Sequence, residues 1–560
     1  MTPQPRWRWL PWLLCIALAV LVMWPMSVYP GLLHRTPNTP LHMMVLEHLV
    51  AAMRGDVVDL SHVIAADYPQ GRPVRIIGWP FQLLAIPMVP VLGTAGALNM
   101  SLTLSLLASG LLMVVLLERM SLGLAARCVG AAAWMMNPFL ISFLSNGQYE
   151  NHVGWAFPMV LLGMLSGGVR GSVVIALGLI GAAFSSPYQA IPVALVIVAA
   201  MPFNHRHRLG VWAALVVAFV ACYAYFTGPQ PMPGGECGPT SGTMPAVLSE
   251  VVGGMAGIHL PPAPDRATSL LAALTQPVEW TGELALHRMS VTPTVGFLGF
   301  IPLIGGLIGL VAFRKHRWAQ PLALGGLLCF VLALGPDLAI QRDQIITLPL
   351  PGDLLGLLPG VSQMGTTVRF LTGVAFVLVV GTALWMDWIE RWLRHGGGGG
   401  GLVAILIVVS VGAIGAEWLY GTRSPVPMET QAYRLPQGFE ALPEDGAVLA
   451  VPVGGGMPPE AHLWMGVVHG QPVVGYCAEG LDALRARLAL VEYAQGGALP
   501  DPSTVHEELA SLAAQGITYV AFVTTQRGAD RFEADLTKMT RLLGPPDALG
   551  DSVIGYRTQR

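Results

Sequence analysis

Polar and ionisable side chains interrupt the apolar runs of residues 1–421, and two of these polar stretches carry most of the candidate functional residues. One stretch is residues 30–80 and the other is residues 145–152. Their candidate functional residues are Asn38, His42, Glu47, Asp56, Asp59, Gln148, Glu150 and His152. Polar side chains beside a bilayer are costly unless they line a wet cavity, so both stretches are predicted to belong to a site.

The residue types suit transfer of a group from a lipid carrier, since the tail of such a carrier needs lipid and its head needs water. A carboxylate can deprotonate an acceptor hydroxyl, and arginine or histidine can stabilise a phosphate leaving group. The candidate bases are Glu47, Asp56 and Asp59. The candidates for contacting substrate are Asn38, His42, Gln148, Glu150, His152 and Arg369.

Plainer roles are open for three of these residues. Glu47 suits the water-facing side of a surface helix, His152 suits the start of a helix, and Arg369 suits an anchor at a span end. Histidines 205, 207 and 316 stand among arginines, which explains them better than metal ligation does. The sequence predicts no metal site.

The composition is that of a multi-spanning membrane protein. The mean hydropathy is +0.59 and 11% of the 560 residues are charged, against about 25% in soluble proteins. The formal net charge of −3 comes without a basic stripe. Binding to the phosphates of a nucleic acid is therefore excluded.

Apolar runs and the positions of basic residues predict about 11 spans with a cytoplasmic N-terminus, because short cytoplasmic loops collect Lys and Arg. The expected spans are residues 10–29, 95–117, 124–144 and 153–165, one on each side of the turn 185–188, then 209–226, 293–313, 319–334, 370–385 and 402–420. Loops 30–80, 228–292 and 335–368 then lie outside the membrane. Residues 41–53 are expected to form a surface helix, and residues 79–92 an interfacial segment.

From residue 422 the composition becomes that of a soluble protein, which predicts a domain boundary between 1–421 and 422–560. Strands are expected at 447–453 and 517–523, and a helix at 503–514 with Ser503 as its N-cap. This second part is predicted to be a small extracytoplasmic α/β domain. Four of the six cysteines fall in apolar runs and are expected to act as small hydrophobes, whereas Cys237 and Cys477 could form a disulfide.

Several short motifs resemble those of the bacterial GT-C glycosyltransferase-like membrane proteins, and more closely their YfhO-like and uncharacterised branches. They are Trp79-Pro80 through Gly93 leading into Ala97-Leu98-Asn99, the turn Asn146–His152 followed by Trp155 and Pro158, and Leu358-Pro359-Gly360 ahead of Val368-Arg369-Phe370. The resemblance implies a GT-C-like helical bundle with a polyprenyl-phosphate-linked sugar as donor substrate and no separate cofactor. It also implies an acidic residue early in the first outer loop. Residues 34–40 contain no acid, and Asn38 stands about where one is expected.

Three functions remain open from the sequence. The first is a glycosyltransferase of a bacterial inner membrane, with membrane lipids and a lipid-linked sugar as partners and Glu47 as the preferred base. The second is a non-catalytic relative that binds a lipid-linked glycan or assists envelope assembly, which Asn38 favours. The third and weakest is a transporter. Catalysis predicts a carboxylate of the first loop near His152.

Overall fold

The structure is a computed structural model of the chain. It describes residues 7–29, 32–34, 39–55, 62–63, 72–73, 78–145, 147–149, 152, 154–201, 210–213, 215–216, 220, 298–333, 337–341, 344–349, 367–395, 400–422, 430–432, 442, 447–452, 473–474, 488–494, 497–523, 529–549 and 553–559. Cys237, Cys477 and the loop 228–292 lie outside these residues. Cys15, Cys128 and Cys329 are buried free thiols, as expected of small hydrophobes.

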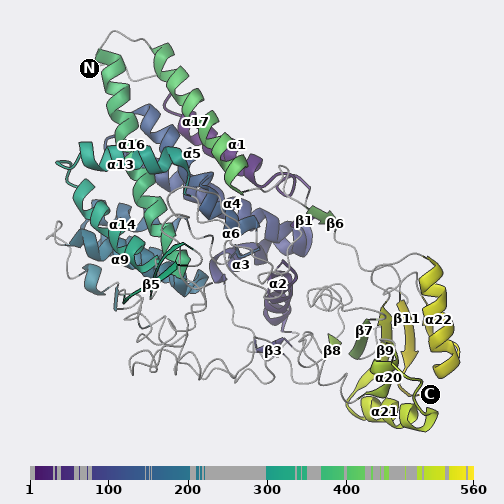
Figure 1. Cartoon of the computed structure of the whole chain (residues 1–560). Helices are drawn as coiled ribbons and strands as arrows, with labels where there is room; N and C mark the ends of the chain where they lie inside the picture. The colour runs from purple at the N-terminus through teal and green to yellow at the C-terminus, as the bar shows by residue number, and fades with distance from the viewer. Residues whose placement is uncertain are drawn as a thin grey trace.

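Most of the described chain is a bundle of apolar helices (Figure 1). In chain order they are α1 (Leu10–Val22), α2 (Thr39–Arg54), α3 (Trp79–Ala85), η2 (Ile86–Met88), α4 (Val89–Arg119), α5 (Leu124–Met135), α6 (Pro138–Ser145), α7 (Ala156–Ser166), α8 (Gly168–Ser185), α9 (Pro187–Ala200), α13 (Phe300–Ala312), α14 (Ala319–Ala333), η8 (Thr367–Phe370), α16 (Leu371–His395) and α17 (Gly400–Thr422). The surface helix expected at 41–53 is α2. The turn expected at 185–188 separates α8 from α9.

Four helices are long and apolar enough to cross a membrane within the described residues, and a bent pair makes a fifth. Five more apolar helices there are shorter, with 10–17 residues. These helices identify a membrane protein. The expected count of about 11 spans is not confirmed.

The span expected at 124–144 is not one helix. It breaks between α5 and α6, which form the bent pair with an angle of 41°. Pro138 cannot donate a backbone hydrogen bond, and the Asn137 side chain replaces the lost contacts. Its Oδ1 accepts from the amides of Phe139 at 3.1 Å and Leu140 at 3.4 Å, while its Nδ2 donates to the Leu298 carbonyl at 3.0 Å. The break therefore also holds the chain just before α13.

Residues 79–92, expected as an interfacial segment, form α3, η2 and the first residues of α4. Gly93 has a φ of 69° and interrupts α4. A glycine tolerates this left-handed conformation, so the chain changes direction there. The regular part of α4 then begins close to Ala95, where a span was expected.

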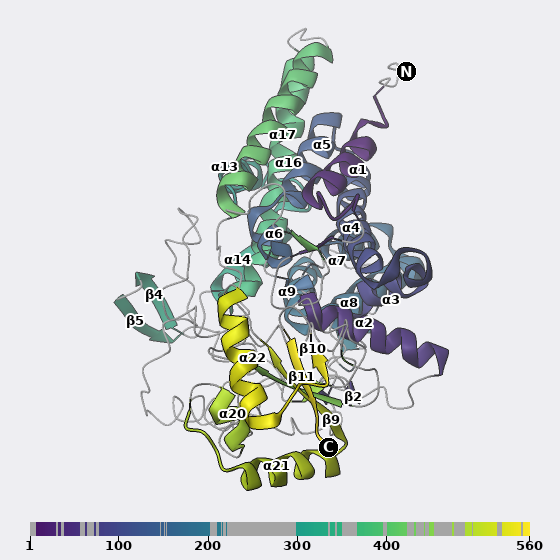
Figure 2. The ribbon, with the colours of Figure 1, turned by 90° about the vertical axis from the view of Figure 1, so that its right-hand side faces the viewer.

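Two strands far apart in the sequence join the beginning of the chain to the segment after α17. Strand β1 (Leu32–His34) pairs antiparallel with β6 (Thr430–Ala432). The segments were expected on the same side of the membrane, and their pairing requires them to be together. Both views place α2 at the end of the bundle nearer the five-stranded sheet (Figures 1 and 2). Which side of the membrane this end faces stays a prediction.

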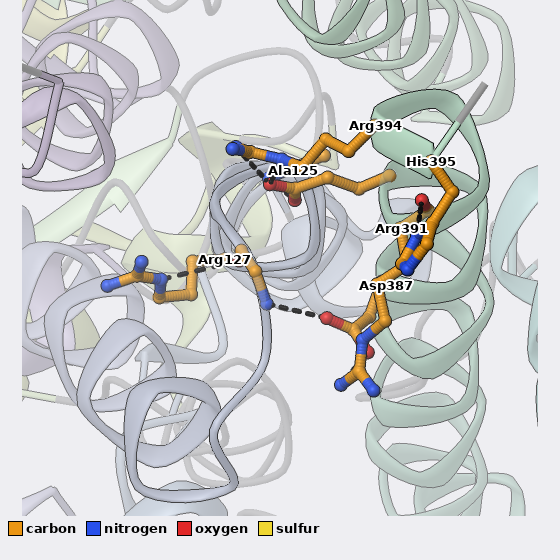
Figure 3. Close-up of polar contacts among 8 residues, drawn as sticks. Ala125, Arg127, Asp387, Arg391, Arg394 and His395 are labelled. Carbon is orange, nitrogen blue, oxygen red and sulfur yellow. Dashed lines mark hydrogen bonds and ion pairs between the residues drawn. The ribbon is translucent and has the colours of Figure 1, made fainter. Parts of the chain in front are cut away.

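Two acids of α16 fix the start of α5 at the opposite end (Figure 3). Asp387 Oδ1 accepts from the Gly123 amide and Glu390 Oε2 from the Ala125 amide, both at 2.7 Å. Both acids are buried. Arg391 pairs with Asp387 and Arg394 with Glu390, each at 2.6 Å. The first amides of a helix have no partner within the helix, so these carboxylates satisfy two amide donors at the start of α5.

The C-terminal part contains a mixed five-stranded sheet in the order β10-β11-β9-β7-β8. Its strands are β7 (Ala447–Pro452), β8 (Val473–Val474), β9 (Ile517–Val523), β10 (Ala548–Leu549) and β11 (Val553–Arg557), with helices α20 (Ala489–Ala494), α21 (Pro502–Ala514) and α22 (Ala529–Leu543). The expected strands and helix are present. The N-cap of α21 is Asp501, whose side chain accepts from the Ser503 amide, and not Ser503 itself. The predicted extracytoplasmic location is untested.

Candidate functional site

The helix α2 is attached to the turn that follows α6. His42 Nε2 lies 3.2 Å from the carbonyl oxygen of Gly147, and Thr39 shares a 2.8 Å hydrogen bond with the Tyr149 hydroxyl. The rings of His42 and Tyr149 lie 4.9 Å apart, and Phe81 of α3 lies against both. The two polar stretches of the sequence are therefore in direct contact.

Hydrogen bonds to backbone carbonyl groups hold the turn around His152 in place. The His152 amide donates to the Tyr149 carbonyl at 3.1 Å, and Ser105 Oγ donates to the His152 carbonyl at 3.5 Å. The indole of Trp134 donates to the Gly154 carbonyl at 3.0 Å. The position of His152 is thus set by α4, α5 and the turn itself.

Trp134 is a site-supporting residue that sequence reasoning missed. Its ring is fully buried and packs edge-on against Phe157 and Phe376, at 5.9 Å and 5.5 Å. Its position in the middle of an apolar run was a usable signal. A tryptophan N–H that is buried away from an interface needs a hydrogen-bond partner.

Glu47 lies on α2, and its carboxylate contacts Thr94 at the start of α4. The Thr94 side chain, next to the break at Gly93, donates a hydrogen bond to its carboxylate. Burial raises the pKa of Glu47 to about 7, and the Thr94 hydrogen bond opposes that shift. At 100° per residue, Glu47 stands roughly 140° around α2 from His42. Within the described residues, Thr39 and His42 contact the turn and Glu47 contacts Thr94, and a first-loop carboxylate near His152 stays a prediction.

His152 is buried with an exposure of 3%, and neither ring nitrogen has a hydrogen bond of good geometry to the described residues. Burial lowers the pKa of His152 to about 4, and the nearby backbone of Leu140 opposes the shift. The ring is consequently neutral at neutral pH. It can offer one donor and one acceptor to a ligand, but no positive charge.

The remaining candidates divide into buried residues and residues outside the described part of the chain. Arg369 lies on η8 with an exposure of 5%, so it is enclosed by protein and does not extend into an interface. Gln148 has an exposure of 1%, and its backbone N–H donates to the Phe143 carbonyl at 2.8 Å. Outside the described residues are Asn38, Asp56, Asp59 and Glu150.

Comparison with known protein families and with curated proteins found no match. Among solved structures, the chain is similar to the archaeal oligosaccharyltransferase AglB from Archaeoglobus fulgidus, with a TM-score of 0.49 and 13% identity over 96% of this chain and 71% of that chain. It is similar to ArnT from Cupriavidus metallidurans, with a TM-score of 0.46 and 14% identity over 99% of this chain and 98% of ArnT. It is also similar to the mycobacterial arabinofuranosyltransferase AftD, with a TM-score of 0.45 and 15% identity over 93% of this chain and 37% of AftD.

The AglB structure contains an inhibitory peptide and a dolichol-phosphate, and the ArnT structure contains undecaprenyl phosphate.

Proposed function

We propose that this chain is a membrane glycosyltransferase-like protein that transfers a sugar from a polyprenyl-phosphate carrier to an envelope lipid, polymer or protein. The observation that carries the proposal is the attachment of α2 to the turn 147–152. It brings polar groups of two distant segments together at one end of an apolar bundle. Such an end offers lipid to the carrier tail and polar groups to its head.

The described residues can divide the reaction between them. The acceptor hydroxyl attacks the anomeric carbon of the sugar, the bond from that carbon to the phosphate oxygen breaks, and polyprenyl phosphate leaves. Glu47 takes the proton of the hydroxyl, and a base works best when its pKa is near the operating pH. Arg369 stabilises the phosphate with its charge, and His152 hydrogen-bonds it as a neutral ring. The acceptor is expected on the Thr94 side of α2.

A second function has its own support. Residues 34–40 contain no acid, and the described contact of Glu47 is with Thr94. Both observations favour a protein that binds a lipid-linked glycan without transferring it. The same contacts of α2 with the turn would serve that role.

One assay separates the two functions. Purified protein in lipid nanodiscs is incubated with a radiolabelled pool of polyprenyl-phosphate sugars and bacterial membrane acceptors, and both retained lipid and transferred label are counted. Transfer that is lost in Glu47→Gln and kept in Glu118→Gln supports the enzyme, because Glu118 is a half-exposed acid that pairs with Arg127 at the other end of the bundle. Retention without transfer in all three proteins supports the binding protein. If the protein neither retains the lipid nor transfers the label, both functions are refuted.

A further inference from the structure

Two glutamines lie completely inside the bundle without hydrogen bonds to their side chains. Gln82 of α3 and Gln189 of α9 each have an exposure of 0%. Within the described residues, neither the Nε2 nor the Oε1 atom of either side chain has a partner. Buried polar groups are nearly always paired, and each unpaired group costs about 1–3 kcal/mol. Two whole amides in this state indicate that something absent from the structure binds them.

The two glutamines flank one junction between helices. The Gly78 amide, just before α3, donates to the carbonyl of Ser185, the last residue of α8, at 3.0 Å. Gln82 lies one helical turn beyond Gly78, and Gln189 lies in the first turn of α9 just beyond Ser186. Each glutamine thus follows a residue of the same contact by four positions in the chain.

This junction lies beside the candidate functional site. Phe81, the neighbour of Gln82 on α3, packs against His42 and Tyr149. On the other side, η8 with the buried Arg369 packs against α9, which carries Gln189. Gln82 therefore follows the residue that packs against α2 and the turn, and Gln189 lies on the helix that packs against the segment with Arg369.

The hydrogen-bond donors and acceptors of the two glutamine side chains restrict the kind of ligand that can bind them. Each amide presents two N–H donors and one carbonyl acceptor, so its partner must both donate and accept hydrogen bonds. A phosphate diester accepts only and would leave both Oε1 atoms unpaired. A sugar presents hydroxyl groups that do both, and it carries no charge that a buried amide would have to neutralise.

We propose that Gln82 and Gln189 bind the hydroxyl groups of the sugar on the lipid-linked donor. The inference rests on the proposed function and adds the part of the site that recognises the sugar. Ordered water is the other group that could satisfy both amides, and it would show no preference for a sugar.

The test compares sugar-bearing with sugar-free lipid. Native mass spectrometry measures the dissociation constants of undecaprenyl phosphate and of its glucose, mannose, galactose and arabinose esters for the full-length protein. In Gln82→Met and in Gln189→Met we expect binding of the preferred ester to weaken about five- to tenfold, the value of about one hydrogen bond. Binding of undecaprenyl phosphate should change less than about twofold. Gln515→Met, on an exposed position after α21, is the matched control and should change neither.

The other outcomes are decisive. If the variants keep the wild-type preference for a sugar ester, or if wild type has no such preference, this inference is wrong while the proposed lipid binding stands. If both lipids weaken equally, the amides act on the fold or bind water, and the inference is again wrong. If wild type binds neither lipid, the proposed function fails together with the inference. Gln→Leu variants replace any Met variant that does not fold and are judged by the same criteria.

Discussion

His42 Nε2 lies 3.2 Å from the carbonyl oxygen of Gly147, across 105 residues of sequence. Because a carbonyl oxygen only accepts, the proton of a neutral His42 ring must be on Nε2. This contact and the hydrogen bond between Thr39 and Tyr149 fasten one side of α2 to the turn that carries His152. The candidate site depends on that attachment.

The attachment can be measured as a coupling energy between Thr39 and Tyr149. Thr39→Val and Tyr149→Phe each remove one partner of a buried hydrogen bond, so each should lower the free energy of unfolding by about 1 kcal/mol. The double variant should lose little more than either single variant, which gives a coupling of about 1 kcal/mol. Unfolding in mixed detergent micelles provides these values. Additive losses would show that the two hydroxyl groups act independently.

The transfer rate should depend on pH through Glu47. Its pKa is raised from 4.5 to about 7, and only the ionised carboxylate can take a proton. We therefore expect kcat/KM to increase with pH until about pH 7 and then to level off. The Thr94→Val variant loses the hydrogen bond that favours the charged form, so its profile should move to higher pH. A rising limb centred near pH 4.5 would show that the base is not a buried Glu47.

The stability of the fold should depend on pH through two groups whose contributions have opposite signs. The pKa of His152 is lowered from 6.5 to about 4, so between these values the unfolded chain binds the proton more tightly and stability rises with pH. Glu47 has a raised pKa, so the folded chain binds the proton more tightly between about pH 4.5 and 7, and stability falls with rising pH. His152→Gln should remove the first contribution and Glu47→Gln the second. Unfolding temperatures from pH 4 to 8 would reveal both, and unchanged profiles in the variants would contradict the burial of these groups.

Close packing of α13 on α16 depends on glycine. A Cβ added to Gly309 would overlap the backbone carbonyl of Gly381, which cannot move aside like a side chain. Gly309→Ala should therefore cost about 1–3 kcal/mol of unfolding free energy. Gly412→Ala on α17 is the control, since a Cβ there meets nothing within 4 Å and alanine favours the helix. Equal effects of the two substitutions would contradict the packing of these helices.

The sequence was informative where the signal is local. Apolar runs predicted the helices near their observed positions, and the turn at 185–188 was found where expected. The amphipathic segment at 41–53 was expected as a helix and forms α2. The first loop and the turn near His152 were both predicted to belong to a site, and His42 of the first loop contacts Gly147 of the turn.

The remaining features depend on partners that are distant in the chain. Nothing local shows that β1 pairs with β6, or that Asp387 and Glu390 satisfy the first amides of α5. The rotation of α2 about its own axis sets which of its side chains face the neighbouring helices. The amphipathic pattern of α2 alone does not predict that Glu47 contacts Thr94. Gln82 and Gln189 sit in apolar helices, and only their burial distinguishes them from surface glutamines.

A lipid-linked sugar is proposed to bind where α2 meets the turn 147–152, and photocrosslinking can locate the bound lipid. Polyprenyl phosphate with a photoreactive group beside the phosphate is bound to the protein in nanodiscs, irradiated, and mapped by peptide mass spectrometry. We expect adducts on peptides from α2, α3, the turn or η8, and an excess of unlabelled undecaprenyl phosphate should suppress them. Adducts confined to the opposite end, around Gly123 and the acids of α16, would contradict the proposal.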